Sequence, residues 1–410
     1  MHPRGLLGSL PLGRRGFLGL SAGFAAWAGL GREGRCAEAA QTDPRLVVLV
    51  LHGGLDGLAL AAPIQDPAFA ELRGDLGFAD GLPLVDGFVL NPLMRQLHGL
   101  FLAGDALIAH AVASPYRDRS HFDAIDVLEG GCPVPRAARS GWLHRALAVL
   151  PRPMPAALPH GLTAAVPIGV VLDDRVPPLL KGDAVPVANW TAGRIPAASE
   201  AMQEQVLTLY DSTDPALATA LRAGQRLERL ADGLSRAAEG VSPAVADALA
   251  AASLLAQPAG PRVAVLGSGG WDTHRDEVPA LNRRLIELDA IIDALRRGLG
   301  QTWGRTVLIV VTEFGRAVRI NGSQGSDHGT ATVALLAGGA VAGGRVLADW
   351  PGLGEGDLLD GRDLRPTLDL RALFKGVLRD HLGVSPERLD GPIFPASERV
   401  RPLDGLLRAV

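Results

Sequence analysis

Three short segments carry carboxylate or imidazole side chains close to glycine, and each lies beside a strand-like apolar run. The first holds Asp272 and His274, the second Glu313, and the third Asp327 and His328. Carboxylate oxygens and imidazole nitrogens are the groups with which proteins bind Zn²⁺, Mn²⁺ and related ions. Such groups at the ends of several strands indicate a metal-dependent enzyme whose site is assembled from distant parts of the chain.

The spacing within these segments supports that interpretation. Asp272 and His274 are separated by one residue, so an extended loop places both side chains on the same side. Glu313 lies at the end of the strongest predicted strand, residues 306–311. A charged group at that place needs a partner, which is either a metal or Arg316.

Two earlier positions offer further candidates, each with an ordinary alternative. Asp56 follows the apolar run 46–51 and is interpreted either as a metal ligand or as a cap for the next helix. Ser120 precedes a helix predicted over 124–129. There its hydroxyl is either a nucleophile, favoured by the helix amides and a metal, or a helix N-cap.

The residues around Ser120 suggest an anionic substrate. His121 and Asp123 are expected to line the site, while Arg117 and Arg119 are suited to bind an anionic group in bidentate fashion. No Gly-x-Ser-x-Gly elbow follows a strand, which argues against a hydrolase of the Ser-His-Asp type. The chain also lacks the Gly-x-x-x-x-Gly-Lys loop that grips nucleotide phosphates.

Alternating strands and helices must position these groups. Short apolar runs predict strands at 46–51, 107–112, 168–172, 262–266, 306–311 and 332–336. Leucines at helical spacing predict a helix over 277–299. This alternation favours an α/β fold with a doubly wound, mostly parallel sheet and helices on both faces.

Two helical blocks complete the expected organisation. Residues 197–256 are rich in Ala, Leu, Glu and Arg at helical spacing, which predicts a helical insertion between two halves of the sheet. Residues 362–382 predict a final helix that begins at Thr367 or Asp369.

The N-terminus is predicted to be a targeting segment. Arg14 and Arg15 precede an apolar run over 16–30, and a small-x-small cleavage site follows at 37–39. The apolar run is shorter than the ~20 residues of a membrane span, although an amphipathic first helix or an uncleaved anchor remains the alternative. We therefore expect a Tat signal peptide over 1–39, the Tat translocon as a partner during export, and a periplasmic or extracellular mature domain over 40–410.

Composition excludes several classes of protein. The 410 residues are 47% hydrophobic and 20% charged, which is typical of a globular chain. The net charge is −4, the arginines are scattered and only two tyrosines are present, so nothing predicts a nucleic-acid surface.

Taken together, these segments resemble the DUF1501 family, a group of bacterial proteins of unassigned activity that are commonly exported by the Tat route. The similarity extends over about residues 43–400. The segments that carry it are Leu51–Leu58, Arg119–Asp123, Gly141–Leu143, Gly270–His274, Thr312–Arg316, Gly325–Gly329 and Asp349–Leu353.

That family in turn resembles the alkaline phosphatase and sulfatase superfamily in its core. The resemblance implies a doubly wound sheet, one or two divalent metals and a Ser, Thr or Cys nucleophile. By position, Asp56 would match the metal carboxylate after the first strand and Ser120 the nucleophile. Asp272 and His274 would match an Asp/His pair, and His328 the closing histidine. The chain departs from the superfamily after the 306–311 run, where one acidic residue stands in place of two ligands.

The leading hypothesis is an exported metal-dependent hydrolase of phosphate or sulfate esters, acting on a small anionic ester. In it Ser120 attacks, and Arg119 or Arg316 braces the ester oxygens. A divalent metal (Zn, Mn or Ca) would be held by a set drawn from Asp56, Asp272, His274, Glu313, Asp327 and His328. The rivals are a catalytically silent envelope scaffold, suggested by the incomplete ligand set, and a transferase that passes the same group to another acceptor.

Overall fold

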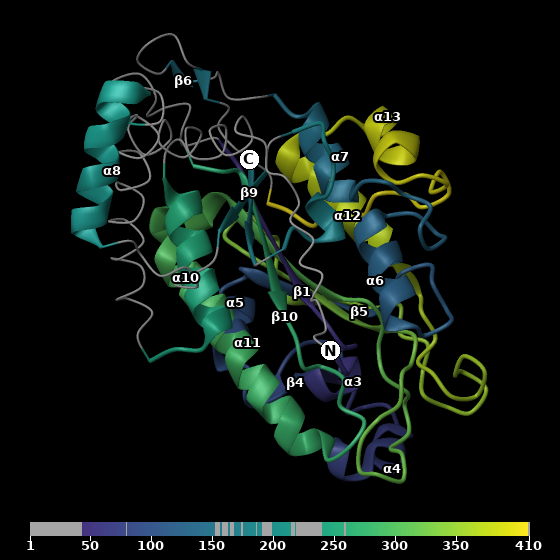
Figure 1. Ribbon diagram of the computed structural model, residues 1–410. Helices are drawn as coiled ribbons and strands as arrows, with labels where there is room; N and C mark the ends of the chain where they lie inside the picture. The colour runs from purple at the N-terminus through teal and green to yellow at the C-terminus, as the bar shows by residue number, and fades with distance from the viewer. Residues whose placement is uncertain are drawn as a thin grey trace, which may run out of the picture.

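The computed structural model of the chain describes most of residues 43–408 (Figure 1). The residues outside this description are 1–42, 79, 152–155, 158–162, 165–167, 174, 186, 191–198, 215–217, 219–239, 258–259 and 409–410. The predicted signal peptide and much of the predicted helical insertion therefore lie outside the described residues.

A nine-stranded sheet forms the centre of the molecule. Its order is β13 (Arg345–Leu347), β5 (Ala106–Ala113), β12 (Thr332–Ala337), β11 (Thr306–Thr312), β1 (Arg45–Leu51), β10 (Val263–Ser268), β8 (Gly169–Leu172) and β9 (Val187–Trp190), with β14 (Leu368–Asp369) also paired to β5. Pairing is parallel except at β12, which is antiparallel to both β11 and β5. The predicted mostly parallel sheet is confirmed.

The central strand β1 shows why these residues form a strand buried on both faces. All seven of its residues are buried. Val47 and Leu49 contribute to the hydrophobic core on one face, whereas Leu46 and Val48 contribute to the core on the other. A continuous apolar run is typical of a parallel strand covered by helices on both sides.

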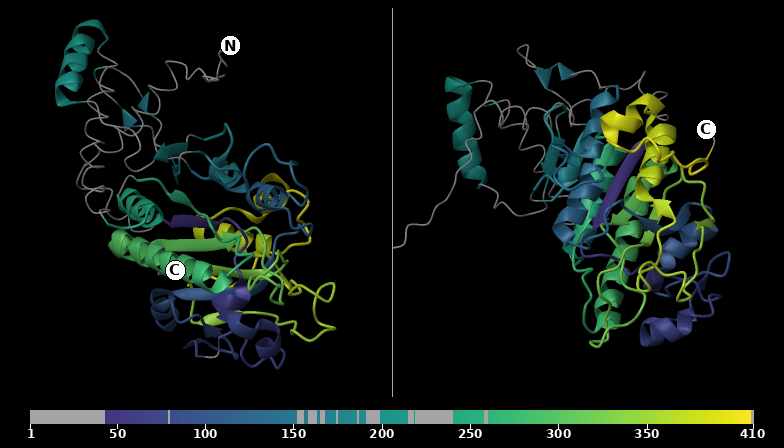
Figure 2. Two further views of the ribbon diagram at one scale, coloured as in Figure 1. Left: turned by 60° about the horizontal axis from the view of Figure 1, so that its bottom comes forward. Right: turned by 90° about the vertical axis from the view of Figure 1, so that its right-hand side faces the viewer.

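Helices cover both faces of the sheet, as predicted (Figures 1 and 2). One face packs against α5 (Arg95–Leu102), α10 (Pro243–Ala256) and α11 (Glu277–Leu299), and the other against α6 (His121–Gly130), α7 (Trp142–Val149) and α12 (Leu370–Leu382). Helix α11 has the bounds that its leucine spacing predicts. Among the described residues, no helix has the length and apolar character needed to cross a membrane.

One helix boundary differs from the sequence prediction, and another agrees with it. Helix α6 begins at His121 rather than at residue 124. The final helix begins at Leu370, where the Asp369 side chain accepts a hydrogen bond from the amide of Arg371 at 2.8 Å. Asp369 is one of the two starts that the sequence predicts, and Pro366 disfavours a helical conformation for the residue before it.

The remaining elements lie outside the sheet and the helices that cover it. They are α3 (Gly57–Leu60), α4 (Phe69–Arg73), α8 (Glu200–Thr213), α13 (Pro386–Arg388), the 3-10 helices η1 (Gly74–Leu76), η3 (Pro178–Leu180) and η4 (Gly300–Arg305), the π-helical turn η5 (Leu389–Ile393), and the short strands β2 (Ala61–Ala62), β3 (Leu82–Pro83), β4 (Val89–Leu90), β6 (Ala156–Ala157) and β7 (Thr163–Ala164).

The topology brings the candidate loops to one edge of the sheet. Strand β1 lies between β10 and β11 and is parallel to both, so the loops that follow all three strands leave from the same edge. Strand β12 runs the opposite way, so the segment before it reaches that edge as well. Strand β5 is also antiparallel to β12, so the segment that follows β5 starts at the same edge of the sheet.

Candidate functional site

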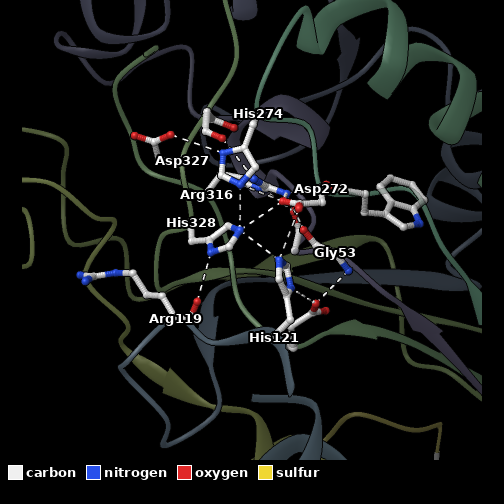
Figure 3. Close-up of polar contacts among 12 residues, drawn as sticks. Gly53, Arg119, His121, Asp272, His274, Arg316, Asp327 and His328 are labelled. Carbon is white, nitrogen blue, oxygen red and sulfur yellow. Dashed lines mark hydrogen bonds and ion pairs between the residues drawn. The ribbon is translucent and has the colours of Figure 1, made fainter. Parts of the chain in front are cut away.

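Three side chains from different loops converge at this edge (Figure 3). One ligand atom each of His121, Asp272 and His328 lies within 4.8 Å of the other two. The Nε2 atom of His328 is 3.0 Å from Nε2 of His121 and 3.1 Å from Oδ1 of Asp272. His274 adjoins this cluster, with its Nε2 atom 2.9 Å from Nε2 of His328 and 3.1 Å from Oδ1 of Asp272.

Hydrogen bonds to the other ring nitrogens orient two of these imidazoles. Nδ1 of His328 donates to the carbonyl oxygen of Arg119 at 3.1 Å. Nδ1 of His121 donates to Oε1 of Glu313 at 2.8 Å. Each of these two bonds places the ring proton on Nδ1. The Nε2 atom of each neutral ring therefore presents a lone pair. Two lone pairs 3.0 Å apart repel unless a proton or a cation lies between them.

The separations within the cluster fit a small metal ion. Bonds of about 2.0–2.1 Å to a tetrahedral Zn²⁺ place the ligand atoms about 3.3 Å from one another. The observed separations of 2.9, 3.0 and 3.1 Å are close to that value. The donor set of imidazole nitrogens and one carboxylate oxygen is also one that Zn²⁺ and related ions prefer.

The charges in the cluster are set by its neighbours. The hydrogen bond to Glu313 raises the pKa of His121, whereas burial lowers the pKa of His328. Burial favours the neutral form of Asp272, but Arg316, His328 and His274 together outweigh burial through hydrogen bonds and charge, and they lower the pKa of that carboxyl. The cluster therefore contains an ionised Asp272, a neutral His328 and, at His121, a ring that binds a proton more tightly than usual.

Arg316 ties the surrounding loops together. Its side chain is fully buried. All three of its guanidinium nitrogens are engaged, with Oδ1 of Asp272 and the carbonyl oxygens of Gly53, Gly54, Trp271 and Ser326 as acceptors. The prediction that Arg316 braces ester oxygens is wrong, because the guanidinium is buried and each of its nitrogens already donates to the protein. It instead orients Asp272.

The assignment of Asp56 as a metal ligand is also corrected. Its side chain is 2% exposed and caps α3, with Oδ1 accepting from the amides of Leu58 and Ala59 at 3.0 and 3.1 Å. Its Oδ2 atom forms a buried ion pair with Arg73. Both oxygens are committed, so the helix-cap alternative holds.

Two other predicted ligands lie behind the cluster. Glu313 uses Oε1 for Nδ1 of His121 and the amide of Gly53, and Oε2 for the hydroxyl of Thr312. Burial opposes its ionisation, but these bonds outweigh burial and lower the pKa of Glu313. Asp327 similarly lies behind His274, with Oδ1 3.4 Å from Nδ1 of that ring. Both carboxylates orient a histidine rather than face the centre of the cluster.

His121 has a larger role than the sequence suggested. Its ring belongs to the cluster itself, whereas the sequence assigned it only to the lining. The signal that could have revealed this is the combination of a histidine at a helix start with an acidic residue at a strand end, since carboxylates commonly orient metal-binding imidazoles.

Ser120 and Arg119 flank His121. Ser120 occupies the N-cap position of α6, yet its side chain makes no capping hydrogen bond, so the cap alternative is not observed. Arg119 adopts a left-handed backbone conformation, with φ of 59°. Its carbonyl oxygen faces His328, while its guanidinium turns away from the cluster to Asp363, with bonds of 2.7 and 2.9 Å (Figure 3).

Glu277, at the start of α11, joins two loops of the site. Its side chain is fully buried, and Oε2 accepts a hydrogen bond from the hydroxyl of Ser326. The amide of Ser326 donates to the carbonyl of Thr273, which connects the same two loops. Burial, helped by the nearby charge of Asp56, raises the pKa of Glu277 to about 7.

Comparison with known proteins gives one family match. The model of the family described as "Protein of unknown function (DUF1501)" matches residues 103–391. Curated proteins provide no match to the chain.

Three solved structures illustrate a distant likeness to this chain. The C-terminal periplasmic domain of EcEptC from Escherichia coli in complex with Zn is 10% identical, with a TM-score of 0.31 over 73% of this chain and 74% of that one. Ps i-CgsB in complex with k-i-k-neocarrahexaose is 11% identical, with a TM-score of 0.40 over 88% and 77%. The phosphonate monoester hydrolase of Agrobacterium radiobacter is 11% identical, with a TM-score of 0.33 over 84% and 74%. Likenesses at this level carry no argument about activity.

Proposed function

Because this chain belongs to the DUF1501 family, whose function is unknown, we propose a function from the site itself: a metal-dependent hydrolase of phosphate or sulfate esters. The observation that carries the proposal is the convergence of His121, Asp272 and His328, whose ligand atoms lie within 4.8 Å of one another. The ring nitrogens that face away are occupied by Glu313 and a carbonyl oxygen, so the facing nitrogens are free to bind a cation.

His121, Asp272 and His328 would hold a divalent metal, with His274 as a further ligand beside them. An imidazole-rich donor set suits Zn²⁺ or Mn²⁺ and argues against Ca²⁺, which takes oxygen ligands. When bound, such an ion supplies a Lewis acid that polarises an ester oxygen.

Ser120 is the proposed nucleophile. It directly precedes His121, and its hydroxyl is not used to cap α6. The first amides of that helix favour negative charge on a group at its N-terminus, which helps the serine oxygen to develop charge as it attacks. The bond between phosphorus or sulfur and the ester oxygen would then break, the alcohol would leave with the proton that the serine loses, and water would release the phosphate or sulfate from the serine.

Export by the Tat route is part of the proposal. It rests on the Arg14-Arg15 pair and the apolar run that follows. Fractionation of cells that produce the wild type or the R14K/R15K double variant tests it. The wild type should be recovered from the periplasm or medium, and the double variant from the cytoplasm. Equal export of the two proteins would count against the Tat route.

The hydrolase proposal is tested by activity on aryl phosphates, phosphodiesters and aryl sulfates after loading with Zn²⁺ or Mn²⁺. Ser120→Ala should abolish turnover while retaining metal, and His328→Ala should lose both. A loaded wild type that turns over none of these esters would contradict the proposal.

A catalytically silent, metal-binding scaffold is the second candidate. The observation that favours it is that Asp56 and Glu313 are both engaged elsewhere, so fewer carboxylates face the cluster than the sequence predicted. Stoichiometric metal binding without turnover on any ester would support the scaffold. Turnover that Ser120→Ala removes would exclude it.

A further inference from the structure

A cavity of about 550 Å³ lies beside the histidine cluster and shares two chain segments with it. Arg119 contributes to both places, since its carbonyl oxygen accepts from His328 and its side chain lines the cavity. Thr330, also in the lining, follows His328 by two residues. Two residues span at most ~7 Å, so a ligand in the cavity would lie a short distance from the cluster.

Three guanidinium groups line this cavity, and protein acceptors fix each of them. Arg119 binds Asp363 through Nε and Nη2. Arg365 binds the carbonyls of residues 357 and 358 through Nε and Nη2, at 2.9 and 3.0 Å. Arg117 binds the carbonyls of residues 114 and 116 through Nη1. Each guanidinium thus keeps donors for a ligand, and fixing it in advance lowers the entropy lost on binding.

The charges around the cavity favour an anion. Asp363 is fully buried and accepts bonds from Arg119, Arg362 and Thr330, so it neutralises one of these cations. Asp360 also lines the cavity, but it is 75% exposed and 3.9 Å from Arg119. A carboxylate so well solvated offsets little of the arginine charge.

Asp118 is the other acidic residue in the lining, and it too is exposed. Counting Arg362, four arginines therefore stand against one buried and two solvated carboxylates, which leaves a positive balance. Planar guanidinium groups with free N–H donors match the oxygens of phosphate, sulfate or carboxylate.

We propose that the cavity formed by Arg117, Arg119 and Arg365 binds a second oxyanion of the substrate, so that the natural ester carries two anionic groups. One would lie at the histidine cluster, and the other would be held by the arginines. The reaction at the first group rests on the proposed hydrolase function, whereas the anion site stands on the cavity alone.

Binding to the metal-free protein tests the anion site separately from catalysis. Chelator-treated wild type, the R117Q/R365Q double variant and the matched control Arg388→Gln, an exposed arginine outside the cavity, are titrated with inorganic phosphate, sulfate and acetate by calorimetry. Circular dichroism verifies that all three proteins are folded. The double variant should bind the preferred anion at least ~10-fold more weakly, and the control should match the wild type. Equal binding by the double variant and the wild type, or no binding by the wild type, would overturn the proposal.

A substrate series then tests the link to the reaction. The metal-loaded wild type is assayed on alkanediol monophosphates and bisphosphates of increasing chain length. At one linker length the bisphosphate should have a lower KM than the monophosphate, and R117Q/R365Q should remove that advantage without lowering kcat on the monophosphate. If the wild type hydrolyses mono- and bisphosphates with equal KM at every length, the second anion is not part of the substrate. A protein that binds anions at the arginines but hydrolyses neither series would instead contradict the hydrolase.

Discussion

Glu313→Gln tests whether the carboxylate behind His121 supports a metal. The Glu313 side chain is 1% exposed, and three donors at 2.8 Å surround its carboxylate, namely Nδ1 of His121, the amide of Gly53 and the hydroxyl of Thr312. Glutamine has nearly the same shape but keeps only one acceptor oxygen and carries no charge. Replacing a carboxylate that orients a metal-binding imidazole typically weakens the metal 10–100-fold, or about 1.4–2.8 kcal/mol.

The pH dependence of this effect has a definite sign. Glu313 raises the pKa of His121, so in the wild type a proton competes with the metal for Nε2 as the pH falls through that raised pKa. In Glu313→Gln the pKa of His121 falls, and the competition begins at lower pH. The wild type should therefore bind the metal more tightly than Glu313→Gln by the largest factor at high pH. This factor should shrink as the pH decreases.

The assay is competition for Zn²⁺ with a chromophoric chelator at about pH 8 and about pH 6. The matched control is Asp289→Asn, a buried carboxylate of α11 that accepts from the amides of Gln96 and Leu97 at 2.9 and 3.0 Å. It should leave the metal affinity unchanged. Equal affinity of Glu313→Gln and the wild type at the higher pH would refute the reasoning, and so would an advantage that grows on acidification.

Three further predictions follow from the described contacts. Ser120→Ala should lower kcat by at least ~10³-fold with unchanged metal content, as judged by ester turnover and metal analysis; residual turnover near the wild-type rate would remove Ser120 from the mechanism. Asp56→Ala should lower the free energy of unfolding by about 3–5 kcal/mol, because it leaves Arg73 buried without its carboxylate partner. Metal binding by the folded variant should persist. A variant that loses the metal but keeps its stability would support Asp56 as a metal ligand. Glu277 binds its proton more tightly in the folded state, with a pKa raised to about 7, so raising the pH from 4.5 towards 7 should reduce stability by on the order of 1.4 kcal/mol per pH unit. The denaturation midpoint of Glu277→Gln should lack this part of the pH dependence. A pH profile of stability identical to that of the wild type would contradict the prediction.

The sequence was informative where a signal is local. The apolar run of β1 and the leucine spacing of α11 each predicted an element whose bounds agree with the structure within a residue. The loops that carry Asp272 and His328 were also identified, because polar residues beside buried strands are visible without knowledge of the fold.

The sequence failed where the outcome depends on distant partners. Asp56 is paired by Arg73, which lies in a separate short helix and carries no sequence mark of that role. His121 becomes part of the cluster because α6 begins at that residue and because the antiparallel β12 brings His328 to the same edge. Neither the start of a helix nor the direction of a strand can be read reliably from residue types alone.

Metal analysis of the purified protein tests the central claim most directly. After incubation with Zn²⁺ or Mn²⁺ and removal of excess ions, the wild type should retain about one equivalent of metal per chain, and the folded H121A/H328A double variant should retain none. A wild type that retains no ion, or a double variant that retains as much as the wild type, would contradict a metal site at His121, Asp272 and His328.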